Sequence, residues 1–74
     1  MQDLFKLYDT VASFNNGLRL EIYHSDAMNW CVTIHSNDGR KIADIENSER
    51  TSAFSKAYEE LRNWAIKNGG IIND

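Results

Sequence analysis

Proline is absent from the 74-residue sequence, and cysteine occurs only once, as Cys31. A single cysteine excludes an internal disulfide, the bond on which small secreted domains usually rely for stability. Apolar runs are short as well, since none approaches the roughly 18 residues that a membrane-spanning helix needs. The first ten residues, MQDLFKLYDT, place an acid where a signal peptide would carry Lys or Arg. These absences predict a cytoplasmic protein that does not contact a membrane.

Positive charge is scarce too. Eight Lys and Arg residues stand against eleven Asp and Glu residues, which leaves a net charge of −3. This balance disfavours nucleic-acid binding, because affinity for nucleic acid depends on cations that neutralise phosphates. It permits a partner with a basic surface. A chain this short buries only about 60% of its unfolded surface, so we expect a single domain over residues 1–74 with a small core and no deep substrate cavity.

Catalytic and metal-binding motifs are missing. His24 and His35 belong to opposite faces of the strands predicted below, and Cys31 and His35 lie about 13 Å apart along one strand, so neither pair can share a metal ion. No CxxC or HxxxH pair occurs, and no phosphate-binding motif surrounds Gly69 and Gly70. We therefore expect a protein that is not an enzyme and holds no cofactor and no metal ion.

Two segments have the apolar spacing of amphipathic helices. The first covers residues 3–14, and Gly17 beyond its end is free to adopt a left-handed conformation. The second runs from about residue 49 to residue 68, with Asn47 or Ser48 as its N-cap. The residues expected to fold back after this helix, or to add a short edge strand, are Ile71 and Ile72.

Alternating apolar and polar residues predict half-buried strands over residues 18–24 and 28–35. The dipeptide Asp38-Gly39 follows, and between alternating runs it is a strong signal for a hairpin with a two-residue turn. A third strand then begins near Lys41. The pairs that this turn places on the buried side of the sheet are Ile34 with Ala43 and Val32 with Ile45.

The same turn decides which side chains face outward. It places Ile42 on the outer face, opposite His35. A slip of one residue would bring Asp44 inside, and the loss of its hydration would cost several kcal/mol. The two-residue turn is therefore the favoured interpretation.

The element order predicts an α+β fold, α-β-β-β-α, in which a three-stranded antiparallel meander carries two helices packed on one face. Nothing then covers the other face of the sheet. Such a face is either simply solvated, as is typical of antiparallel sheets, or a surface that binds a partner. The candidate partner-binding residues on it are Glu21, Tyr23, His35, Ile42, Asp44 and Glu46.

The order of elements resembles that of the double-stranded-RNA-binding domain. In the stretch NSERTSAFSKAYEEL, Ala53, Ala57 and Leu61 are similar to packing residues of that family. The family's lysine cluster, which straddles phosphates, is represented only by Arg50 and Lys56. The resemblance implies a module that recognises RNA by its shape and its phosphates, a function that the acidic composition disfavours.

The chain also resembles small phage-encoded inhibitors, the anti-CRISPR proteins among them. Some of these are acidic single domains with a helix, a three-strand meander with an Asn-Asp-Gly turn, and a C-terminal helix. This chain is similar to them from its first helix through NDG to AFSKAYEELRNWAIKNGG. The resemblance implies a non-enzymatic inhibitor that blocks a component of bacterial defence of the CRISPR-Cas type by occupying its surface.

The functional hypothesis is therefore a protein-binding inhibitor whose partner presents a basic surface, such as that of a nucleic-acid-handling complex. Two alternatives stay open. One is a nucleic-acid-binding module with the topology of the double-stranded-RNA-binding domain. The other is a structural protein that self-associates through an edge strand or through the uncovered face. The oligomeric state, monomer or homodimer, also stays open.

Overall fold

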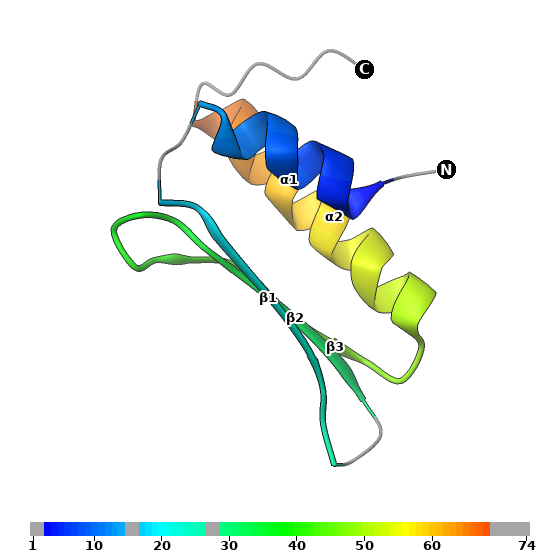
Figure 1. Ribbon diagram of the computed structural model, residues 1–74. Coiled ribbons are helices and arrows are strands. Elements are labelled where there is room, and N and C mark those ends of the chain that lie inside the picture. The colour runs from blue at the N-terminus through cyan, green and yellow to red at the C-terminus, as the bar shows by residue number, and fades with distance from the viewer. Residues whose placement is uncertain (1–2, 15–16, 27–28, 69–74) are drawn as a thin grey trace.

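The computed structural model describes residues 3–14, 17–26 and 29–68. Its strands form one antiparallel sheet in the order β1-β2-β3, and both helices lie on the same side of this sheet (Figure 1). The predicted α+β fold and its α-β-β-β-α order are thereby confirmed. The elements are α1 (Leu4–Ala12), β1 (Arg19–His24), β2 (Trp30–His35), β3 (Lys41–Asn47) and α2 (Arg50–Lys67).

The helix ends differ in part from the prediction. The Asp3 carboxylate caps α1 by accepting a hydrogen bond from the backbone N–H of Lys6 at 3.1 Å, as its position suggests. The N-cap of α2 is Glu49, so the prediction of Asn47 or Ser48 was wrong. Asn47 instead accepts the Glu49 N–H through its Oδ1 at 2.9 Å, a turn that leads the chain into the helix. The predicted closure by Ile71 and Ile72 lies outside the described residues.

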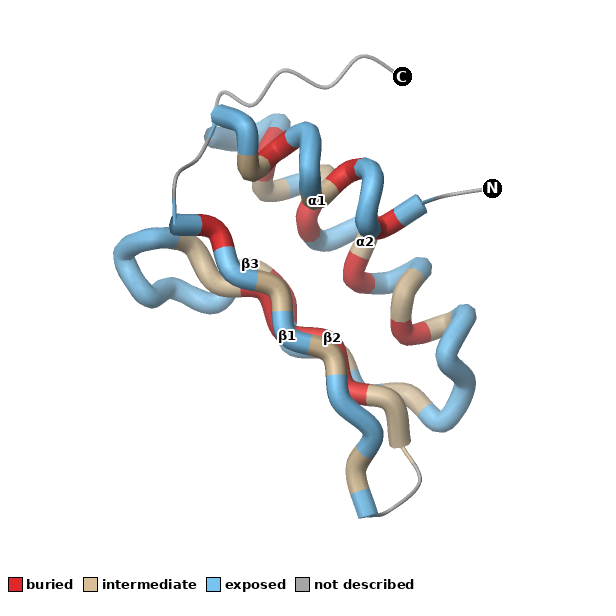
Figure 2. The backbone as a smooth tube through the Cα atoms, in the orientation of Figure 1, coloured by how far each residue is buried: buried red, intermediate tan, exposed pale blue. Residues whose placement is uncertain are grey.

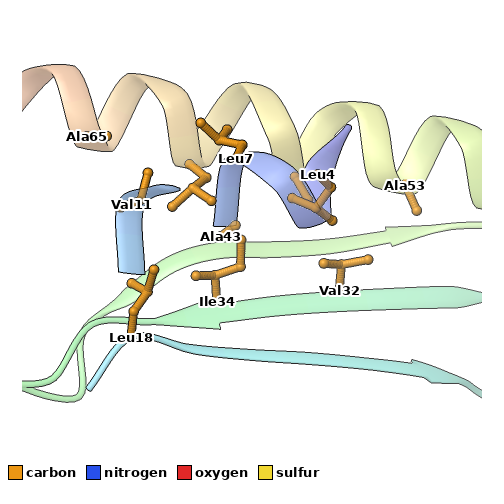
Figure 3. Packing of buried hydrophobic residues seen from close by; sticks show 11 residues of the cluster. Leu4, Leu7, Val11, Leu18, Val32, Ile34, Ala43, Ala53 and Ala65 are labelled. Atoms are coloured by element: carbon orange, nitrogen blue, oxygen red, sulfur yellow. The ribbon is translucent and has the colours of Figure 1, made fainter. Parts of the chain in front are cut away.

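Helix α2 faces the sheet with small side chains. Ala53, Ala57, Leu61 and Ala65 follow one another at four-residue spacing and are fully buried. Because three of these four residues are alanines, α2 can approach the rest of the core closely. It packs on β2, on β3 and on α1. Figure 3 shows the other buried side chains of this core, which come from α1, from β2 and β3 and from the segment before β1: Leu4, Leu7, Val11, Leu18, Val32, Ile34 and Ala43.

The core is deepest under the middle strand. Val32 and Ile34 of β2 are fully buried, whereas Leu20 and Ile22 of β1 are only half-buried. Figure 2 shows buried residues in the sheet and at intervals along both helices. The β1 strand is therefore an edge strand whose inward face is incompletely covered.

The turn between β2 and β3 is longer than predicted. The Gly39 N–H donates to the Ser36 carbonyl at 3.0 Å, and the Ser36 N–H donates to the Arg40 carbonyl at 2.9 Å. The loop therefore has three residues, with Asn37 and Asp38 at its tip and Gly39 at a φ of 87°. A tight turn followed by a left-handed glycine is a common form of the three-residue hairpin. The predicted two-residue tip at Asp38-Gly39 was wrong.

A bulge in β3 compensates for the longer loop. His35 pairs with Lys41, and the next pair along β2 is Ile34 with Ala43, so Ile42 has no partner across the strands. Beyond the bulge the register is the predicted one, with Val32 opposite Ile45. The extra loop residue and the extra strand residue thus cancel each other.

The bulge also changes the position of Ile42. A bulged residue does not follow the strict alternation of a strand. Ile42 is half-buried and packs against the core, instead of standing on the outer face as predicted. Its predicted placement opposite His35 was therefore wrong.

Candidate partner-binding face

The sheet face opposite the helices is covered by no element among the described residues (Figure 1). Alternation along each strand sends one set of side chains toward the helices and leaves the other set on this surface. We refer to it as the open face. Its residues are Arg19, Glu21, Tyr23, Asn29, Cys31, Thr33, His35, Lys41, Asp44 and Glu46.

Strand pairing arranges most of these side chains in three rows across the sheet. The row nearest the β2–β3 turn is basic, and carboxylates stand at the flanks of the other two rows. The open face therefore has a basic end and an acidic end. The rows are Arg19–His35–Lys41, Glu21–Thr33–Asp44 and Tyr23–Cys31–Glu46.

Hydrogen bonds hold the carboxylates of the acidic end in place. Thr33 Oγ1 donates to Glu21 Oε1 at 3.3 Å. Asn29 Nδ2 donates to Glu46 Oε2 at 3.2 Å, and the Cys31 thiol lies 3.9 Å from the same oxygen. Because an ionised carboxylate offers about four lone-pair sites, Glu21 and Glu46 keep acceptor capacity for an outside donor.

Tyr23 is the large apolar side chain of this end, and 56% of it is exposed. Its hydrogen bond with Cys31 raises the pKa of the Tyr23 hydroxyl, and the charge of a Cys31 thiolate, slight burial and the carboxylates of Asp44 and Glu46 act in the same direction. At neutral pH the phenol is therefore a neutral donor among carboxylates. An amphipathic aromatic in such a position is typical of interface anchors.

The basic end is partly neutralised by its neighbours. Lys41 Nζ lies 3.0 Å from Asp44 Oδ2, and Arg19 Nε lies 3.9 Å from Glu21 Oε2. Both pairs are largely exposed, so each contributes only about 0–1 kcal/mol to stability. His35 is half-buried, and its Nδ1 atom is buried without a hydrogen-bond partner.

The structure brings together five of the six predicted candidates. Glu21, Tyr23, Asp44 and Glu46 lie at the acidic end, and His35 lies in the basic row. Ile42 is separated from them by the bulge.

The burial of two residues of the open face was not predicted. Cys31 and Thr33 occupy the middle of this face and are buried, with 7% and 9% of their surfaces exposed. Both stand on the central strand between longer side chains, which close over them. That position was readable from the strand order, because short side chains between long neighbours on a sheet lose their solvent contact.

Among residues 3–14, 17–26 and 29–68, no group of three His, Cys, Asp or Glu side chains is arranged to hold a metal ion. The open face presents oriented carboxylate acceptors beside the exposed aromatic ring of Tyr23.

A groove lies on the helical layer. Its volume is about 560 Å³, and it runs between the first turns of α1 and α2, beside the edge-to-face ring pair of Phe5 and Phe54, whose centroids are 5.7 Å apart. It lies between the helices and therefore apart from the open face. The residues that line it are Asp3, Leu4, Phe5, Arg50, Thr51, Phe54 and Ser55.

Comparison with known proteins gives no relative: no family model, no curated protein and no solved structure matches this chain. No helix in the described part of the chain is both long enough and apolar enough to span a membrane.

Proposed function

We propose that this protein is a non-enzymatic binding protein that holds a basic protein surface with the acidic end of its open face. The observation that carries the proposal is the exposed ring of Tyr23 among the carboxylates of Asp44 and Glu46, on a sheet face that no described element covers. An aromatic anchor beside carboxylates suits a basic partner, whose cations would compete with Lys41 for Asp44 and bind Glu46 directly.

Inhibition of the partner is the proposed effect of binding, and it follows from the size of the domain and from the resemblance to small phage-encoded inhibitors. A domain of this size acts on a larger enzyme by covering part of its surface. The partner class that fits is a nucleic-acid-handling complex, such as a bacterial defence component, because such complexes present Lys and Arg side chains to phosphates. The carboxylates would take the place of those phosphates.

Binding of nucleic acid by this chain is the weaker alternative. Of the exposed cations near the β2–β3 turn, Arg19, Arg40 and Lys41 each stand within 4.0 Å of a carboxylate. Cations that are already paired attract phosphates less strongly. A gel shift with double-stranded RNA at low salt tests this alternative, because phosphate-driven binding is strongest there.

The proposal is tested by capturing partners from a bacterial lysate with the tagged protein, identifying them by mass spectrometry, and measuring the affinity of the purified partner. We expect Tyr23→Ala to weaken that affinity about tenfold or more, as is typical of aromatic anchors. We expect Asp44→Asn with Glu46→Gln to slow association, and raising NaCl from about 50 to about 500 mM to slow it similarly.

A matched control removes the same charge from the helical surface. Glu59→Gln with Glu60→Gln changes two exposed carboxylates of α2 and leaves the open face intact. We expect this variant to bind as the unmodified protein does. If the helix variant loses the partner and the open-face variants keep it, the proposed surface is wrong.

A further inference from the structure

We propose that β1 pairs with β1 of a second copy of this chain, antiparallel and about a two-fold axis at Ile22, so that two sheets become one continuous sheet. This inference concerns the edge of the sheet and does not depend on the proposed function.

The hydrogen-bonding pattern shows which backbone groups of β1 are available. The Ser25 N–H donates to the Asn29 carbonyl at 2.8 Å, so this pair is a hydrogen-bonded pair of the β1–β2 ladder. Hydrogen-bonded pairs alternate in an antiparallel ladder. The odd-numbered residues of β1 therefore bond to β2. No strand among residues 3–14, 17–26 and 29–68 pairs with the other edge of β1, which we call the free edge. The residues whose N–H and C=O groups point to it are Leu20, Ile22 and His24.

One end of this edge is already closed. The Tyr8 hydroxyl of α1 donates to the Leu18 carbonyl at 2.6 Å. By the same alternation, that carbonyl points away from β2, so Tyr8 stands where a neighbouring strand would pass. The open part of the edge begins at Leu20.

The opposite edge of the sheet is protected in a different way. Beyond the bulge, the free backbone groups of β3 belong to Asp44 and Glu46, both acidic, and the bulge at Ile42 distorts this edge. Acidic side chains and bulges are common means by which proteins discourage pairing at an edge. The open part of the β1 edge has no bulge, and its one acidic side chain, Glu21, belongs to a residue whose backbone groups bond to β2.

Charge selects the register. In the pairing that places Glu21 opposite Glu21, two like charges face each other at short range, which is destabilising. With the axis at Ile22, Glu21 lies opposite Tyr23 of the other copy, and no like charges face each other. Leu20 then pairs with His24, so all three residues with free backbone groups are used on each strand.

This register also covers apolar surface. Leu20 and Ile22 are half-buried in the single chain and would each gain apolar neighbours across the new strand pair.

The first test is the mass of the purified full chain in solution. Light scattering and sedimentation equilibrium are measured from dilute to the highest soluble concentration. We expect the mass to rise reversibly to that of two chains. A mass of one chain at every concentration would overturn the proposal, and it would leave the proposed partner binding unaffected.

The second test reads the register with single cysteines in a Cys31→Ala background. Leu20→Cys, Glu21→Cys and Ile22→Cys each place a thiol on the axis of one possible register, at a Cα separation of about 4.5–5.5 Å that a disulfide can span. We expect Ile22→Cys to form the covalent dimer at least tenfold faster than the other two under mild oxidation. Faster crosslinking of Leu20→Cys or Glu21→Cys contradicts the register.

A third measurement separates edge pairing from other contacts. In chemically synthesised chains, an N-methyl group on the Ile22 amide blocks the free edge of β1 and spares its bonds to β2. We expect this chain to stay monomeric with an unchanged circular-dichroism spectrum. The matched control carries the N-methyl group on the Glu46 amide, at the free edge of β3, and we expect it to dimerise. Dimerisation of the Ile22 N-methyl chain would overturn the proposal.

Discussion

Gly17 lies directly against Asn37. A Cβ atom added at Gly17 would stand 2.5 Å from the Cβ of Asn37 and 3.2 Å from its Cα. This contact joins the segment that leads into β1 to the turn between β2 and β3, two parts of the chain that are far apart in sequence. Gly17 also has a φ of 88°, which side chains rarely tolerate. Glycine is therefore required here for two separate reasons.

Gly17→Ala should lower the free energy of unfolding by about 2–4 kcal/mol, because the backbone conformation and the collision with Asn37 both oppose the added methyl group. Gly39→Ala is the matched control. It has the same left-handed φ of 87° but no atom within 4 Å of the added Cβ, so we expect a loss of about 1–2 kcal/mol. Urea denaturation measures both.

A double variant isolates the steric part. Asn37→Gly removes the Cβ that meets the added methyl group, so Gly17→Ala should be less harmful in an Asn37→Gly background. A double-mutant cycle gives the difference as an interaction energy. Equal losses in the two backgrounds would show that the close approach to Asn37 has no energetic weight.

The elements and most of the register were predictable from the sequence because they depend on local alternation. Val32 and Ile34 lie opposite Ile45 and Ala43 as their apolar character requires. The turn was not predictable in the same way. A two-residue loop with a regular strand and a three-residue loop with a bulge at Ile42 give the same pairing beyond the bulge, so the apolar pattern cannot distinguish them.

The candidate site was predictable to a lesser extent. Tyr23 and the carboxylates reach the open face because they alternate with core residues. The burial of Cys31 and Thr33 depends on neighbours in other strands, and the free edge of β1 depends on which pairs are hydrogen-bonded. Both are properties of the assembled sheet, which alternation within one strand does not specify.

Ala57→Leu should destabilise the fold by about 1–3 kcal/mol through overpacking. Ala57 is fully buried on α2 where the helix meets the sheet, and a larger side chain there forces the helix away. Glu59→Leu is the control, because Glu59 is exposed on the same helix and surface changes are usually within about 0.5 kcal/mol. If Ala57→Leu were as stable as the control, the close packing of α2 would be refuted.

Acid should act on the β2–β3 turn through Asp38. The Ser36 hydroxyl and the Arg40 backbone N–H both donate to the Asp38 carboxylate, and these bonds lower its pKa. Because the pKa of Asp38 is lower in the folded state, its ionised carboxylate stabilises the fold at pH values above its ordinary pKa of about 3.9. This stabilisation is lost as the pH falls through the lower pKa of the folded state.

Ser36→Ala removes the largest of these effects, so the pKa of Asp38 should move up toward its ordinary value. Titration of the Asp38 carboxyl carbon by NMR measures the change. Thr51→Ala alters a hydroxyl on α2 and should leave Asp38 as it is. A pKa for Asp38 that is the same with and without the Ser36 hydroxyl would contradict this account of the turn.

Alkali should act on the open face through Tyr23. The Cys31 sulfur is the largest cause of the raised pKa of Tyr23, ahead of the carboxylates of Asp44 and Glu46. Because the neutral phenol is favoured in the folded state, its contribution to stability is fully present at pH values below the ordinary pKa of about 10. It is lost as the pH rises through the raised pKa of the folded state.

NMR titration of the Tyr23 ring carbon should show this pKa falling in Cys31→Ala, and by less in Asp44→Asn. In Tyr23→Phe, part of the decline in stability above about pH 10 should disappear. A larger response to Asp44→Asn than to Cys31→Ala would mean that the acidic flank, and not the contact with the buried thiol, controls the phenol that we place at the centre of partner binding.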